Sequence, residues 1–227
     1  MTKPTLVFDL DGTLIDTAPD LLDSLNHCLA LCDLPAADPH DLGRYVGMGG
    51  RVMIQRAFEA NHKSVSEERL TELLAVFIDH YGGNMPGKSR PYPGAIEAMD
   101  RFEAAGWALA ICTNKLDMLA NRLIGSLGLP ERFAANCGAD RFAFRKPDPR
   151  HLNETILLAG GAPSCAVMVG DSRTDIDTAK AAGIPVIAVD YGYTDRHVGE
   201  FEPSRVISHF DEMTIEMAEG LMRAAAA

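Results

Sequence analysis

The sequence of 227 residues predicts an α/β protein whose core is a doubly wound (Rossmann-like), mainly parallel sheet, with an inserted helical cap. Short apolar runs typical of buried strands alternate with amphipathic helical segments through the second half of the chain, which is the pattern of parallel strands with right-handed crossovers. Between the first apolar run and the others, only helical periodicity is found. We therefore expect a core at residues 1–15 and 89–227 and a four-helix-type cap at residues 16–88.

The first strand is predicted at Thr5–Phe8, where a β-favouring run stops abruptly at two carboxylates, Asp9 and Asp11. Gly12 then indicates a tight turn. In open parallel sheets, ligands bind in the crevice beyond the carboxyl ends of the strands. Two acids at such a place repel each other unless a cation or a shared proton relieves them. The pair therefore indicates a metal site; the alternative is a helix N-cap followed by an Asp-Gly turn.

Helical periodicity predicts the four cap helices. The first begins near Pro19 and Asp20, and the last follows a capping box at Ser64–Glu67. The predicted segments are a helix carrying Leu21, Leu22, Leu25 and Leu29, then helices over 38–46 and 51–60, and a fourth from 67 to about 81. Residues 16–19 and 82–87 are the expected hinges, because proline and glycine interrupt regular structure.

Within the expected cap, three glycines in the segment Val46–Gly50 precede Arg51 at the start of a predicted helix. Such a segment exposes backbone N–H groups that favour anions, and a cation at a helix N-terminus is unfavourable unless an anion is bound there. We expect Arg51 to bind a second anionic group of a substrate. The alternative is a glycine-rich loop followed by a solvated arginine.

The returning core is expected to continue the alternation of strands and helices. The predicted strands are 107–112, 133–137, 166–169 and 186–189, and the predicted helices are 96–102, 116–127, 149–159 and 174–182. Polar residues follow the strands, and the carboxyl ends of parallel strands meet at one edge of a sheet. These polar residues are therefore candidates for a shared site.

Composition narrows the possible partners. A formal net charge of −11 argues against nucleic acid and anionic membranes as partners. The first apolar segment is too short for a signal peptide or a membrane span. The five cysteines are scattered, which favours reduced thiols and a cytoplasmic location. We expect a monomer or homodimer that binds a small molecule.

The string Phe8–Leu14 resembles the first motif of the haloacid dehalogenase superfamily of phosphohydrolases. The resemblance implies that Asp9 is a nucleophile that becomes phosphorylated and that Asp11 is a general acid and base. Asp9 would bind Mg²⁺ through its side chain and Asp11 through its backbone carbonyl. Gly12 would allow close approach of the phosphoryl group, and Thr13 would hydrogen-bond Asp11 or a phosphate oxygen.

Two further strings resemble the second and third motifs of this superfamily. Thr113 would donate its hydroxyl to the phosphoryl group, with Asn114 and Lys115 beside it as substrate-binding candidates. Lys146, in Arg145–Pro149, would reach the nucleophile and the phosphate. Alone, Thr-Asn after a strand is common loop chemistry, and a lysine before proline is common at a surface.

The string Val169–Asp175 resembles the fourth motif, in which acids complete the metal site. Asp171 would be a direct Mg²⁺ ligand, and Asp175 would act directly or through water. Hard oxygen ligands of this kind suit Mg²⁺. The structural alternative for both acids is an N-cap or first-turn role in a helix.

Shorter strings at 113–115, 146–149, 170–173 and 191–193 resemble phosphoglycolate phosphatases and their relatives. The resemblance implies hydrolysis of 2-phosphoglycolate, with a cap that closes over the site and selects substrates. The alternatives are a phosphatase for another small or sugar phosphate, a β-phosphoglucomutase-like phosphomutase, and a binding protein without activity on the same fold. A dehalogenase is disfavoured because it needs no metal and keeps only the first acid, and an ion-pumping ATPase would need membrane spans.

Overall fold

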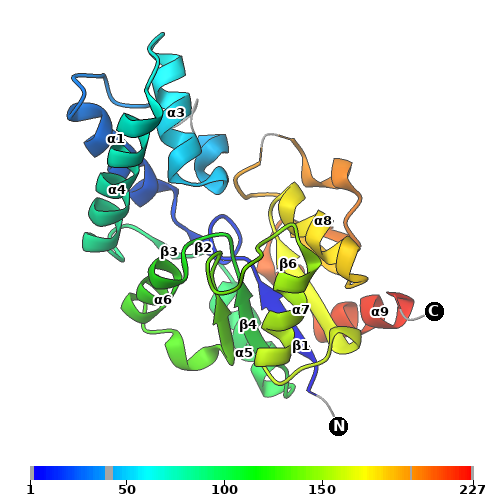
Figure 1. The fold of residues 1–227 in the computed structure, drawn as a ribbon. Coiled ribbons are helices and arrows are strands. Elements are labelled where there is room, and N and C mark those ends of the chain that lie inside the picture. Colours follow the sequence, from blue (N-terminus) through cyan, green and yellow to red (C-terminus); the bar gives the residue numbers. More distant parts are fainter. Residues whose placement is uncertain (1–2, 39–42, 195, 226–227) are drawn as a thin grey trace.

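A computed structural model describes residues 3–38, 43–194 and 196–225 of the chain (Figure 1). Its main sheet has six parallel strands in the order β5-β4-β1-β6-β7-β8. The strands are β1 Thr5–Phe8, β4 Ala108–Cys112, β5 Ala135–Cys137, β6 Ala166–Gly170, β7 Val186–Val189 and β8 Arg205–Ile207. The doubly wound parallel sheet predicted from the sequence is confirmed.

Helices cover both faces of the sheet, and the alternation of side chains along β1 shows how. Leu6 and Phe8 belong to a hydrophobic cluster with α5, α6 and α9, whereas Val7 belongs to a cluster with α7 and α8. These helices are α5 Ala95–Ala104, α6 Asp117–Ser126, α7 Pro149–Leu158, α8 Arg173–Ala182 and α9 Ile215–Ala225. Because both faces are buried, β1 carries a continuous apolar run.

The predicted core strands lie within two residues of the observed ones, but β8 and α9 were not predicted. The strand β8 has three residues, of which Arg205 is exposed, so it lacks the buried apolar run that identified the others. Its pairing with β7 extends the sheet by one edge strand. Short 3₁₀ helices occupy other connections, at η2 Pro130–Arg132, η3 Pro163–Cys165, η4 Val198–Phe201 and η5 Phe210–Glu212.

The segment predicted as a cap forms α1 Ala18–Ala30, η1 Gly43–Met48, α3 Gly50–Ala60 and α4 Glu67–Gly83. The α-helix expected over 38–46 falls partly outside the described residues, at 39–42. Over the rest, the prediction of an α-helix is wrong, because residues 43–48 form a 3₁₀ helix. Gly43 and Gly47 weaken an α-helix there. The capping residue of α4 is Ser66, which accepts the N–H of Arg69, in place of Ser64.

The cap helices α1, α3 and α4 pack on one another around their own hydrophobic cluster and stand beyond one end of the sheet (Figure 1). The outgoing and returning linkers run side by side, because β2 Ile15–Asp16 pairs antiparallel with β3 Arg90–Pro91. Asp20 joins them by accepting the backbone N–H groups of Lys88 and Ser89 at 2.8 and 2.7 Å. The domain limits at 15/16 and 88/89 stay a prediction.

No helix in the described part of the chain is both long enough and apolar enough to cross a membrane.

Candidate active site

The three central strands place the predicted residues at one edge of the sheet. Asp9 follows β1, Thr113 follows β4 and Asp171 follows β6, and β1 lies between the other two strands. The ladder continues past the strand ends, because the N–H of Asp9 donates to the carbonyl of Val169 at 2.8 Å. The common direction of the strands thus brings together residues that are 58 to 162 positions apart in the chain.

Lys146 lies between two of the buried acids. Its Nζ is 2.9 Å from Oδ1 of Asp9 and 2.6 Å from Oδ1 of Asp175. The other oxygen of Asp175, Oδ2, accepts from the hydroxyl of Ser172 at 2.6 Å, within the capping box that begins α8. Asp175 therefore combines the helix-capping role with a direct contact to the lysine of the third motif.

Asp171 is held at both of its oxygens. The hydroxyl of Thr13, expected on Asp11 or a phosphate oxygen, donates to Oδ1 at 2.9 Å, and the backbone N–H of Tyr193 donates to Oδ2 at 2.7 Å. Gly12 has a φ of +81°, and a Cβ there would lie 2.6 Å from Oδ2 of Asp171. Only glycine fits this turn, because a side chain would be strained and would collide with the acid.

Ligand oxygens of Asp9, Asp171 and Asp175 all lie within 4.8 Å of one another. Burial raises the pKa of Asp9 to about 6, although Lys146 lowers it, and Asp175 and Asp11 raise it further. Burial, then Asp175 and Asp9, raise the pKa of Asp171 well above its usual value. Among the described residues, Oδ1 of Asp9 has no well-aligned hydrogen bond. Crowded, buried carboxylates of this kind fit a divalent cation, which would relieve their repulsion.

Asp11 is held by a lysine and a threonine. Nζ of Lys115 lies 2.8 and 3.0 Å from its two carboxylate oxygens, and the hydroxyl of Thr17 donates to Oδ1 at 2.7 Å. The Lys115 side chain is 4% exposed. Burial opposes its charge, but Asp11 and Tyr81 raise the pKa of Lys115 above its ordinary value. Lys115 thus brings a buried positive charge to the predicted acid and base.

The loop that carries Lys146 is fixed by two neighbours. The side chain of Asn114 donates to the carbonyl of Lys146 at 3.0 Å, and the N–H of Lys146 donates to Nδ1 of His151 at 3.2 Å. The hydroxyl of Thr113 accepts the N–H of Lys115 at 3.2 Å, and it donates to no other residue within the described ranges, so its proton suits a ligand. The substrate-binding role expected for Asn114 stays a prediction, since its side chain holds the lysine loop.

Tyr81, from cap helix α4, reaches this site. Its ring centroid lies 4.4 Å from Nζ of Lys115, a cation–π contact. The side chain is buried, and its hydroxyl has no hydrogen-bond acceptor among the described residues, although its closeness to Lys115 helps to raise the pKa of that lysine. Buried hydroxyl groups are normally satisfied, so this one suits a ligand oxygen.

Arg51 lies elsewhere on the cap surface. Its side chain is 42% exposed and pairs with Glu67, the first residue of α4. In this arrangement the arginine neutralises a carboxylate of the cap. Its predicted contact with a substrate anion stays a prediction and would require the pair to separate.

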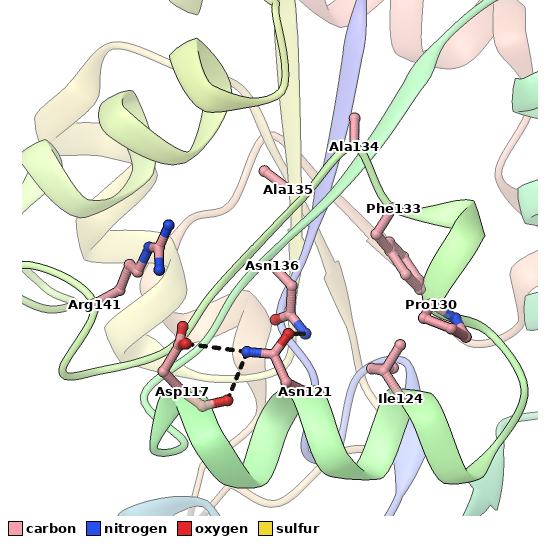
Figure 2. Close-up of a pocket in the computed structure, with 9 residues that line it drawn as sticks. All are labelled: Asp117, Asn121, Ile124, Pro130, Phe133, Ala134, Ala135, Asn136 and Arg141. Carbon is pink, nitrogen blue, oxygen red and sulfur yellow. Dashed lines mark hydrogen bonds between the residues drawn. The ribbon is translucent and has the colours of Figure 1, made fainter.

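A cavity of about 260 Å³ lies away from this site, beside the edge strand β5 and helix α6 (Figure 2). There the Asn121 amide donates to the backbone carbonyl and to Oδ2 of Asp117. None of the predicted site residues lines this cavity.

Four residues of the site were not predicted from the sequence: Thr17, Tyr81, His151 and Tyr193. Tyr193 was part of a quoted string, but its hydrogen bonds were not expected. Thr17 and Tyr81 belong to segments interpreted as a hinge and a cap helix, and their contacts with the core arise only from the fold. The Tyr-Gly-Tyr string at 191–193 was the one available signal, but it indicated only a resemblance.

Comparison with known proteins agrees with this geometry. Residues 6–189 match the sequence model of the haloacid dehalogenase-like hydrolases. The chain belongs to this family and is a hydrolase. The resemblance of its first motif to that family is thus confirmed.

Individual relatives narrow the comparison. A phosphoglycolate phosphatase of Mesorhizobium japonicum is 66% identical over 99% of both chains, and one of Agrobacterium fabrum is 48% identical over 99% of this chain and 97% of its own. The crystal structure of a predicted phosphoglycolate phosphatase from Haemophilus somnus superposes with a TM-score of 0.85 at 29% identity, covering 93% of this chain and 96% of that one.

Proposed function

We propose that this protein is a phosphatase that hydrolyses 2-phosphoglycolate through a phosphorylated Asp9, with Mg²⁺ as its cofactor. The observation that carries the proposal is the cluster of Asp9, Asp171 and Asp175 around Lys146 at the strand ends. The relative that is 66% identical over almost the whole of both chains supports the choice of substrate.

In the proposed reaction, a carboxylate oxygen of Asp9 attacks phosphorus and the ester oxygen leaves. Asp11 protonates the departing glycolate oxygen and then takes a proton from the water that hydrolyses the acyl phosphate, which returns Asp9 to a carboxylate. Lys146 and the free proton of Thr113 stabilise the charge that spreads over the phosphoryl oxygens. The in-line geometry of such a transfer requires these groups to be held in place, as the buried contacts described above do.

Mg²⁺ would be held by Asp9, the backbone carbonyl of Asp11 and Asp171, with Asp175 bound directly or through water. It would supply positive charge to the phosphoryl oxygens and to the attacking carboxylate. The crowding of the acids supports this ligand set, because three buried carboxylates next to one lysine leave an excess of negative charge.

The carboxylate of 2-phosphoglycolate would be received by Lys115 and Tyr81. Lys115 is a buried cation beside the predicted acid, and Tyr81 presents a buried hydroxyl within the same group of side chains. An anionic leaving group would give the ammonium a second counter-charge and the hydroxyl an acceptor. A neutral leaving group of the same size would provide neither.

The test is phosphate release from 2-phosphoglycolate, ethyl phosphate and glucose 6-phosphate, each with Mg²⁺ and with a chelator. We expect Mg²⁺-dependent release that is fastest with 2-phosphoglycolate, and no release by Asp9→Asn. Ethyl phosphate is the matched control, because it carries a neutral methyl group where 2-phosphoglycolate carries the carboxylate. Faster release from the sugar phosphate would contradict the substrate. Glucose 1-phosphate is incubated in parallel, and its conversion to glucose 6-phosphate without phosphate release would indicate a mutase.

A further inference from the structure

The segment Tyr191–Tyr193, which follows β7, packs directly against the side chain of Asp171. A Cβ on Gly192 would lie 2.2 Å from Cβ of Asp171, a distance that no side chain tolerates. Glycine at this position lets the backbone come close enough for the N–H of Tyr193 to donate to Oδ2 of Asp171 at 2.7 Å. The position of Tyr193 is therefore tied to the metal-site acid through its backbone.

The side chain of Tyr193 extends to the outgoing hinge of the cap. Its hydroxyl accepts the backbone N–H groups of Thr17 and Ala18, both at 2.9 Å, and donates to Oδ1 of Asp16 at 2.7 Å. Ala18 is the first residue of α1, and N–H groups at a helix start have no partner inside the helix. The Tyr193 hydroxyl supplies that partner from the core.

The same hinge turn holds the predicted acid. The hydroxyl of Thr17 donates to Oδ1 of Asp11 at 2.7 Å in place of capping α1. The backbone of Thr17 is thus held by Tyr193 while its side chain holds Asp11. Three hydrogen bonds therefore link Asp171 to Tyr193, Tyr193 to Thr17 and Thr17 to Asp11. Tyr193 and Thr17 each take part through both the backbone and the side chain.

We propose that Tyr193 is a positioning residue whose hydroxyl fixes the hinge turn at residues 16–18, so that Thr17 keeps Asp11 aimed at the leaving oxygen. The proposal deepens the proposed function and rests on it, since it requires Asp11 to act as the acid. Lys115 also holds Asp11, so the loss of one hydroxyl should weaken the positioning without abolishing it.

Tyr193→Phe separates the two ends of this connection. It keeps the backbone N–H on Asp171 and removes the three hydrogen bonds to the hinge. The test compares kcat/KM for 2-phosphoglycolate with that for p-nitrophenyl phosphate, whose leaving group needs little protonation. We expect a loss of about tenfold with 2-phosphoglycolate and less than about twofold with p-nitrophenyl phosphate, as for a weakened general acid.

Calorimetric titration with Mg²⁺ provides a readout that does not depend on turnover. We expect the affinity of Tyr193→Phe for Mg²⁺ to stay within about twofold of the wild-type value, because its contact with Asp171 is a backbone bond. Tyr191→Phe is the matched control on the same segment, since its hydroxyl donates to the carbonyl of Thr13 at 3.2 Å and does not reach the hinge. It should not show the dependence on leaving group.

A double-mutant cycle with Thr17→Val completes the test. If both hydroxyls act on Asp11 through the same connection, the double variant should lose no more activity on 2-phosphoglycolate than the worse single variant. Equal losses on both substrates, or losses that multiply, would overturn the proposal. Asp11→Asn separates failure of the acid role from failure of the positioning role. If Asp11→Asn loses equal activity on both substrates, the proposed acid role of Asp11 is wrong. If Asp11→Asn depends on the leaving group but Tyr193→Phe loses equal activity on both substrates, only the positioning role of Tyr193 is overturned.

Discussion

The ammonium group of Lys146 lies 2.9 Å from Oδ1 of Asp9, and the two side chains are 1% and 13% exposed. In this buried setting the lysine offsets part of the negative charge of the acid cluster. In the proposed reaction it would also contact the oxygens of a phosphoryl group on Asp9. One side chain therefore offsets charge in the free site and, in the proposed reaction, would stabilise the charge that develops during transfer.

Replacing this lysine should affect both roles. We expect Lys146→Met to lower kcat by a factor of about 10²–10³, the usual cost of losing one charged contact to the reacting group. Its metal-free form should unfold at a lower temperature, because removing one partner of a buried ion pair leaves carboxylates uncompensated. Steady-state kinetics and thermal denaturation measure the two effects. The control is Lys180→Met, which removes an exposed ammonium from α8, and equal kcat values for the two variants would contradict the assignment.

Asp11→Asn should slow the reaction with 2-phosphoglycolate by about 10²–10⁴, the range expected for a lost general acid and base. The loss in kcat/KM should be smaller with p-nitrophenyl phosphate. The backbone carbonyl of residue 11 is retained, so Mg²⁺ should still bind in a calorimetric titration. Loss of Mg²⁺ binding in this variant would instead mean that the side chain of Asp11 is a ligand.

The raised pKa of Asp9 predicts how pH changes the effect of Mg²⁺ on stability. A carboxyl group whose pKa rises on folding stabilises the fold while it is protonated. For Asp9 this contribution is lost as pH rises from 3.8, the pKa in the unfolded chain, through about 6, the pKa in the fold. Metal binding needs the ionised carboxylate. The increase in melting temperature caused by Mg²⁺ should therefore grow as pH rises through about 6. A Mg²⁺ effect independent of pH, at matched ionic strength, would be inconsistent with this linkage.

His151 should make the fold sensitive to acid. Burial and the charge of Lys146 lower the pKa of His151 from 6.5 to about 4. The neutral ring therefore stabilises the fold above pH 6.5, and this contribution, at most about 3 kcal/mol, is lost as pH falls toward 4. Urea unfolding of wild type and His151→Gln at several pH values measures it. We expect the two stability curves to converge in acid, and parallel curves would rule out the contribution.

The part of the fold that could be predicted from the sequence is the part made by buried apolar runs. The strands that precede Asp9, Thr113 and Asp171 are such runs. The polar residues that directly follow each of these strands indicated the site. The 3₁₀ helix η1 and the edge strand β8 were not predictable in this way. Their conformations depend on glycines and on pairing with a neighbouring strand, and neither produces an apolar period.

The site divides in the same manner. Asp9, Lys146 and Asp171 lie in dense local strings and were identified by them. Thr17 and Tyr193 are joined by a hydrogen bond from a backbone N–H group, which every residue type except proline has. A sequence pattern cannot therefore reveal which tyrosine binds the start of α1.

The most direct test of the account is to detect the phosphorylated enzyme. The protein is mixed with 2-phosphoglycolate and Mg²⁺, quenched in acid within the first turnover, digested and mapped by mass spectrometry. We expect one added phosphoryl group on the peptide that contains Asp9, and none in Asp9→Asn, which should also fail to release phosphate. Substantial phosphate release by Asp9→Asn would contradict the covalent route.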